Sequence, residues 1–223
     1  MGEEVLNLVK DEVEKTIQRL NTKQFTPDPI AGRHFSKITS ILSSAYKRHG
    51  YILEHALLEA LKQCPYFEVW RDELFQVPST VDHIVEGSIV AATKLIGTDY
   101  PYSDGQRTLQ VDILVFDKNT GILKAYEVKR GAGLHDSGKR RSMLRDVLCV
   151  QVLLKSYGKQ RGLDVKEAFS HIIFYYGQCS IPKPFSLIGS ELDEHFGWPV
   201  QDAVEEVNAY FQSRLFAILS GAG

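Results

Sequence analysis

The segment VDILVFDKNTGILKAYEVKRG, residues 111–131, constrains the fold more than any other part of this chain. Two apolar runs flank the turn sequence Asn119-Thr120-Gly121, which predicts two neighbouring antiparallel strands. The first run is apolar on both faces, as expected of a central strand, yet it contains Asp112. Burying a charge is costly unless the charge is paired or binds a metal, so Asp112 needs a partner.

The second strand ends in Glu127-Val128-Lys129, which places a carboxylate and an ammonium on one face because side chains alternate along a strand. Pairing about the turn puts Glu127 opposite Asp112. Like charges that face each other destabilise a sheet, and a divalent cation between them would remove the repulsion. Carboxylate oxygens with one or two backbone carbonyls suit Mg²⁺ or Mn²⁺. The alternative is a surface ion pair of Glu127 with Lys129, which would stabilise the fold little.

The same acid-x-lysine spacing occurs a second time, at Asp164-Val165-Lys166. No acidic strand precedes it, and the residues around it predict a helix start that Asp164 caps. The spacing alone therefore does not define a site, and Asp112 is what distinguishes the first occurrence.

Two polar residues fall on the buried sides of expected helices. Glu54 lies at the edge of the apolar stripe of a helix over residues 50–64, so it either points towards the sheet or extends back to solvent. Because Asp112 and Glu127 already need a cation, a third acid is favoured as part of the same site. Gln151 falls inside the buried stripe of a later helix. It is either a core glutamine bonded to backbone, which the pattern slightly favours, or a group that reaches the site.

Periodicity predicts an order of elements typical of a mixed sheet that helices cover on both faces. Besides the two strands above, the expected elements are helices at 3–20, 34–61 with a break or bend near Gly50, 138–157, 190–197 and 199–219, and strands at 66–77 and 168–177. The strand at 66–77 is either continuous or split at Arg71-Asp72. Residues 79–104 give no clear pattern apart from an apolar run at 88–97. The length favours one domain over residues 1–223.

Positive charge is concentrated in one part of a chain whose formal net charge is −2. The segment from Lys129 to Arg145 is strongly basic and contains one acid, Asp136. Such a segment indicates a phosphate-facing patch, and the alternative is a solvated loop and helix start. The candidate nucleic-acid contacts are Arg130, Lys139, Arg140, Arg141 and Arg145, with the loop TDYPYSDGQR at 98–107.

Several classes of protein are disfavoured. No apolar run approaches the roughly 18 residues of a membrane span, and the acidic N-terminal segment does not resemble a signal peptide. No P-loop, GxSxG, HExxH or Rossmann fingerprint is present, and the histidines are scattered. Cys64, Cys149 and Cys179 are expected to be reduced thiols of a cytoplasmic protein.

At this point the residues match a known pattern. Glu54 in a helix, Asp112 in a strand and Glu127-Val128-Lys129 in the next strand, followed by a helix and another strand, together resemble the PD-(D/E)XK nuclease superfamily. The order of these elements supports the resemblance more strongly than the short motif does.

The resemblance covers residues 45–177, with Val111 in place of the proline of the superfamily signature. It implies an α/β, restriction-endonuclease-like fold, with a three-layer α/β/α core around a mixed central sheet. Residues 1–33 would then be an N-terminal helix and connection, and 178–223 a C-terminal helical extension. These flanking helices are expected either to pack on the core or to form a homodimer.

The resemblance also implies a function for the site. The residues that it assigns to Mg²⁺ are Asp112, Glu127, the Val128 carbonyl and Glu54 as a supporting acid. Lys129 would orient or activate the attacking water, and Gln151 would support the site. The chain would then be a Mg²⁺-dependent deoxyribonuclease that hydrolyses phosphodiester bonds of DNA, most simply an endonuclease of restriction or repair type. The alternative is a non-catalytic nucleic-acid-binding module on the same fold.

Overall fold

The computed structural model of the chain describes residues 1–85, 94–95 and 97–221. It divides into two compact units, a helical unit made of Met1–Gln63 with the segment from Gly197, and a sheet unit made of Cys64–Phe196. This division differs from the boundaries expected from the sequence, which placed the core at 45–177 and the flanking segments as separate additions to it. Segments from both ends of the sequence instead form one unit.

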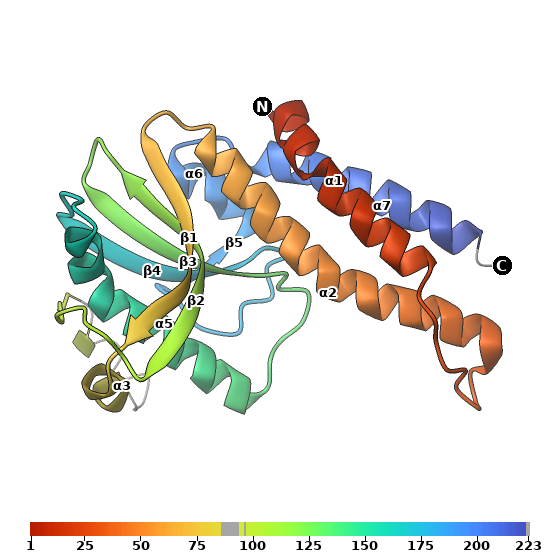
Figure 1. Cartoon of the computed structure of the whole chain (residues 1–223), viewed down its shortest axis with the longest axis horizontal. Helices are drawn as coiled ribbons and strands as arrows, with labels where there is room; N and C mark the ends of the chain where they lie inside the picture. The colour runs from red at the N-terminus through yellow and green to blue at the C-terminus, as the bar shows by residue number, and fades with distance from the viewer. Residues whose placement is uncertain (86–93, 96, 222–223) are drawn as a thin grey trace. The chain divides into compact units, whose positions relative to one another are not determined.

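Three helices make up the helical unit. α1 (Gly2–Asn21), α2 (Gly32–Lys62) and α7 (Gln201–Ser220) pack against one another (Figure 1). α1 buries apolar side chains at intervals of three or four residues, as an amphipathic helix does. These side chains are Val5, Val9, Val13, Ile17 and Leu20. The predicted N- and C-terminal helices are thus confirmed as elements.

Of the break or bend predicted near Gly50, the break is absent, because α2 runs without interruption from Gly32 to Lys62. Glycine lowers helix stability by only about 1 kcal/mol relative to alanine, and it keeps its backbone N–H. The apolar residues on both sides of Gly50 therefore hold one continuous helix.

The sheet unit contains five strands in the order β1-β2-β3-β4-β5. Their bounds are β1 Phe67–Val77, β2 Arg107–Asp117, β3 Ile122–Lys129, β4 Glu167–Phe174 and β5 Ser186–Ile188. β1, β2 and β3 are antiparallel, whereas β4 is parallel to β3 and β5 to β4 (Figure 1). The prediction of an α/β fold with a mixed sheet is confirmed.

Helices cover both faces of this sheet. α5 (Ser137–Gln160) joins β3 to β4, and its Val150 belongs to the same apolar cluster as Ala125 of β3. The next residue, Tyr126, points to the opposite face because side chains alternate along a strand. There its ring contacts His195 and Phe196 of α6 (Leu192–Phe196), which follows the short 3₁₀ helix η1 (Gly189–Glu191).

One local prediction is corrected in the sheet unit, and one helix is added. The helix start expected at Asp164-Val165-Lys166 is wrong, because these residues lie in the connection that leads into β4. The region without a clear pattern contains a helix, α3 (Ser79–Val85), which packs on α5. Most of the apolar run at 88–97 lies outside the described residues.

Candidate functional site

The β2–β3 hairpin brings the predicted residues together. Ile113 pairs with Tyr126, and each further pair towards the turn keeps the register that the turn sequence predicted. Gly121 closes the turn with a φ of +73°, a conformation that glycine adopts without strain. In this register Asp112 and Glu127 occupy the position after the last regular pair, at the open end of the hairpin.

The pairing of β1 with β2 shifts its register beside Asp112. Trp70 pairs with Leu114 and Asp72 with Val111, so β2 has one residue more than β1 over this stretch. Such a β-bulge ends regular pairing and redirects the side chains that it contains. The prediction of a continuous strand at 66–77 is thus correct, with an irregularity where a turn was the alternative.

The carboxylate of Asp112 takes the place of a missing ladder partner. Its Oδ2 accepts a hydrogen bond of 2.8 Å from the backbone N–H of Val128, and its Oδ1 accepts one of 3.0 Å from Nε2 of Gln110. Nε of Arg71 donates to the backbone carbonyl of Asp112 over 3.2 Å. The Asp112 residue is 5% exposed, so the bulge holds a nearly buried carboxylate in a fixed position.

The surroundings of Asp112 disfavour its charged form. Burial raises the pKa of this carboxyl, and the charge of Glu127 raises it further, whereas the Val128 hydrogen bond and the charges of Lys129 and Arg71 lower it without cancelling the rise. A divalent cation next to Asp112 and Glu127 would favour the ionised form of Asp112.

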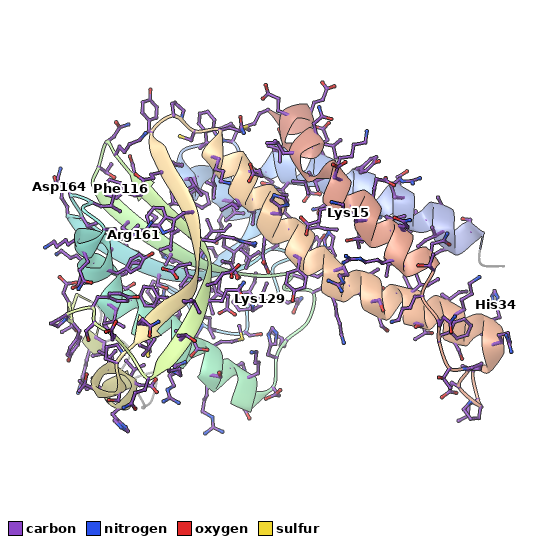
Figure 2. All side chains as sticks on the ribbon, viewed as in Figure 1. Lys15, His34, Phe116, Lys129, Arg161 and Asp164 are labelled. Carbon is purple, nitrogen blue, oxygen red and sulfur yellow. The ribbon has the colours of Figure 1, made fainter. Side chains whose placement is uncertain are left out.

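Glu127 and Lys129 form an ion pair at the end of β3. Nζ of Lys129 lies 2.6 Å from Oε1 of Glu127, with the two side chains 28% and 30% exposed. Lys129 is labelled in Figure 2, away from the Phe116 and Asp164 end of the same sheet unit. The ion pair that the sequence offered as an alternative is therefore present, and it places an ammonium beside the carboxylate.

These groups fit a hard cation only in part. In the stretches that the structure describes, no three His, Cys, Asp or Glu residues are grouped so that they could hold a metal ion. The sheet unit offers Asp112, Glu127 and the Val128 carbonyl, and Mg²⁺ needs no more than one or two carboxylates because it keeps several waters. Glu54 belongs to α2 of the helical unit, so its place beside the strand carboxylates remains a prediction.

Gln151 binds the backbone of β4. Its Nε2 donates to the Ala168 carbonyl over 2.8 Å, and its Oε1 accepts from the Ser170 N–H over 2.7 Å. Both groups lie on the stretch of β4 that precedes the pairs with β5, which begin at Ile172. The Gln151 amide thus satisfies backbone groups at the edge of the sheet, which is the structural role that the sequence slightly favoured.

The predicted nucleic-acid contacts differ in their surroundings. Arg145 binds Asp82 through two nitrogens, over 2.6 and 3.1 Å, and Arg107 binds the same carboxylate over 2.6 Å. Burial raises the pKa of Asp82, but the two guanidiniums hold it below its usual value. Arg145 therefore belongs to an ion cluster inside the sheet unit. The sequence did not predict this cluster, because the segment around Asp82 shows no clear pattern.

The other basic residues remain at the surface. Lys139, Arg140 and Arg141 are exposed on the first turns of α5, and Arg140 and Arg141 line a cavity of about 440 Å³ together with Arg145. The carboxylate of Asp136 caps this helix by accepting from the Lys139 backbone N–H.

The loop at 98–107 is held by its tyrosines. Tyr100 and Tyr102 pack against the apolar core, and the Tyr102 hydroxyl accepts from the Gln76 N–H over 2.9 Å. Both aromatic side chains of this loop are therefore used in packing, and a contact with DNA would depend on its other residues.

A second cavity adjoins the candidate site. Its volume is about 220 Å³, and both Gln110 and Glu127 line it together with Asp146 of α5. Gln110 and Arg71 were missed from the sequence. Gln110 could have been found, because a residue two positions before Asp112 shares its strand face. Arg71 could not, because its approach depends on the bulge.

No protein-family model, curated protein or solved structure matches this chain. Among its described residues, no helix is both long enough and apolar enough to cross a membrane. The site must therefore be interpreted from its own geometry.

Proposed function

We propose that this chain is a Mg²⁺-dependent DNA nuclease with a restriction-endonuclease-like core of the PD-(D/E)XK type. The observation that carries the proposal is the nearly buried Asp112, held at a bulge beside Glu127 and Lys129 with its pKa raised. A sheet gains nothing from two acids at the open end of a hairpin, whereas a cation site needs them.

Each residue of the site would have a separate task. Asp112, Glu127 and the Val128 carbonyl would hold the cation, with Glu54 as the supporting acid. Bound Mg²⁺ would supply Lewis acidity at the phosphate and lower the pKa of a coordinated water. Lys129 would leave its ion pair with Glu127 and donate a hydrogen bond to the attacking water or to a phosphate oxygen, where negative charge develops.

The substrate would lie along the half-buried Arg130 and the exposed basic residues at the start of α5. Arg130, Lys139, Arg140 and Arg141 follow directly on the site in sequence and would contact backbone phosphates, so binding should weaken steeply with salt. We place the enzyme among endonucleases of restriction or repair type, in the cytoplasm. A homodimer through the terminal helices is a separate proposal, which a measurement of mass in solution tests.

Calorimetric titration of Mn²⁺ tests the proposal, with Asp112→Asn as the key variant. Asp164→Asn is a matched control, because Asp164 has the same spacing to a lysine and no second acid strand. We expect binding in the wild type and the control, and none in Asp112→Asn. Cleavage of duplex, single-stranded and branched DNA with Mg²⁺ should follow the same pattern. Equal Mn²⁺ binding by all three proteins, or intact DNA under every condition, would contradict the proposal.

A second candidate function is a non-catalytic nucleic-acid-binding module. This alternative is favoured because both carboxylates already have partners within the protein. Lys129 forms an ion pair with Glu127, and the Val128 N–H donates to Asp112. Salt-sensitive DNA binding that neither needs a divalent cation nor leads to cleavage would support this alternative.

A further inference from the structure

A cation and an aromatic ring meet directly beyond the candidate site. Arg130 follows Lys129 in sequence, and its guanidinium carbon lies 5.7 Å from the centre of the Tyr176 ring. Tyr176 is 45% exposed. The pair therefore presents two flat groups, one of them charged, at the surface of the sheet unit.

The backbone holds this pair in place. The Tyr176 N–H donates to the Arg130 carbonyl over 2.7 Å, and the Tyr175 N–H donates to the Lys129 carbonyl over 2.9 Å. Strand-like pairing of the two segments thus continues past the ends of β3 and β4. Because of it, the backbone that carries the Tyr176 ring is fixed relative to Lys129, which directly follows Val128 of the proposed cation site.

Flat aromatic rings and guanidinium planes are the groups on which unpaired nucleobases stack. In a duplex the faces of each base are covered by its neighbours, and a protein meets only the base edges and the backbone. An exposed tyrosine beside an arginine thus fits a base that has left the stack, with the guanidinium charge near its phosphate.

We propose that Arg130 and Tyr176 form a stacking platform for an unpaired nucleobase of DNA. This inference rests on the proposed function for the path of the strand past Lys129. It narrows the substrate to DNA with unpaired bases near the cleaved bond, namely single strands, flaps or branches, rather than continuous duplex.

Fluorescence anisotropy of a labelled oligothymidine and of a duplex of equal length tests the platform. The measurements use the full chain in EDTA, so that no strand is cut. Tyr176→Ala should weaken binding of the single strand about tenfold, a typical loss for removal of one stacking ring, and leave duplex binding unchanged. Tyr176→Phe, which keeps the ring, should bind as the wild type does.

Three controls make the result specific. Tyr66→Ala removes a tyrosine that is 54% exposed near the other end of the hairpin, where its carbonyl accepts from the Lys118 N–H, and it should have no effect. Arg130→Lys keeps the charge without the planar group, and should weaken only single-strand binding. Tyr176→Leu keeps a branched apolar side chain without an aromatic ring and should behave as Tyr176→Ala does, which covers the case that alanine disturbs folding.

The inference is overturned if Tyr176→Ala binds the single strand as tightly as the wild type does, if it loses single-strand and duplex binding equally, or if the wild type does not bind the single strand. These outcomes are independent of cleavage. A platform without cleavage would reject the proposed nuclease alone, and cleavage without an effect of Tyr176 would reject the platform alone.

Discussion

At the scale of single residues, Asp112 combines two tasks that usually fall to different groups. Its carboxylate satisfies the Val128 N–H where the β2–β3 ladder ends, and it is also the central acid of the proposed cation site. One hydrogen bond to each oxygen, from the Val128 N–H and from Gln110, still leaves lone pairs on both oxygens of the carboxylate. The structural contact therefore fixes the orientation of the group without using it up.

Gln110 should affect metal binding by orienting the Asp112 carboxylate. Its Nε2 bonds Oδ1 of Asp112, so Gln110→Ala removes a contact that orients a proposed ligand. Removal of such outer contacts typically weakens metal binding 10–100-fold, and we expect about a tenfold loss of Mn²⁺ affinity by calorimetry. Because Gln110 is exposed, the free energy of unfolding should fall by less than about 1 kcal/mol.

Thr108→Ala is the matched control for Gln110, since Thr108 is an exposed residue two positions earlier on β2. Its Mn²⁺ affinity should equal that of the wild type. Unchanged affinity in Gln110→Ala would show that Val128 and the bulge alone orient Asp112.

At the scale of elements, part of the edge of β4 has its backbone hydrogen bonds satisfied by a side chain rather than by a neighbouring strand. β5 begins its pairing at Ile172, and the preceding carbonyl of Ala168 and N–H of Ser170 are bonded by Gln151. One amide thus replaces two ladder hydrogen bonds.

Gln151→Leu should therefore destabilise the protein without touching the proposed site. The leucine leaves a buried donor and a buried acceptor unsatisfied, at a cost of about 1–3 kcal/mol each. Urea unfolding should show a loss of about 2–4 kcal/mol, while Mn²⁺ affinity stays unchanged. Gln151→Glu retains an acceptor for the Ser170 N–H but buries a carboxylate against the Ala168 carbonyl, so it should also be destabilised. The opposite result, weaker Mn²⁺ binding at constant stability, would assign Gln151 to the site.

Elements were predicted from the sequence where local chemistry decides them. The Asn119–Gly121 turn fixes the hairpin register, and apolar periodicity gives the long helices. The bulge at Asp112, by contrast, is set by how β1 lies along β2. The same holds for Asp82, whose partners Arg107 and Arg145 come from distant segments. Such contacts leave no periodic trace in the sequence.

At the scale of the whole molecule, stability should depend on pH through two histidines of the sheet unit. Burial, together with a smaller effect of neighbouring positive charge, lowers the pKa of His171 to about 3 and of His195 to about 4. The unfolded chain binds these protons near pH 6.5, whereas the folded chain does not. Stability is therefore full above about pH 6.5 and is lost as the pH falls towards 4.

Urea unfolding between pH 7.5 and 4.5 measures this loss, and His171→Gln should flatten the dependence over that range. His34→Gln is the control, because His34 is exposed on α2 (labelled in Figure 2) and should leave the slope as it is. Equal slopes for the wild type and His171→Gln would mean that other groups set the acid sensitivity.

The division into units was the feature least accessible to sequence reasoning. α1 and α7 pack together although some 180 residues separate them, so no local window contains the information. Apolar periodicity predicted both helices correctly as elements, whereas the expected boundaries placed them on opposite flanks of one core.

That separation has a consequence for synthesis on the ribosome. At about 5–20 residues per second, α7 emerges roughly 10–40 s after α1. Throughout that interval the apolar stripe of α1, from Val5 to Leu20, lacks one of its two helical neighbours, and the whole of Cys64–Phe196 is translated before α7 appears. All residues of the sheet unit would thus be available before those of the helical unit. The apolar stripe of α1 is the segment that a chaperone would be expected to protect in the meantime.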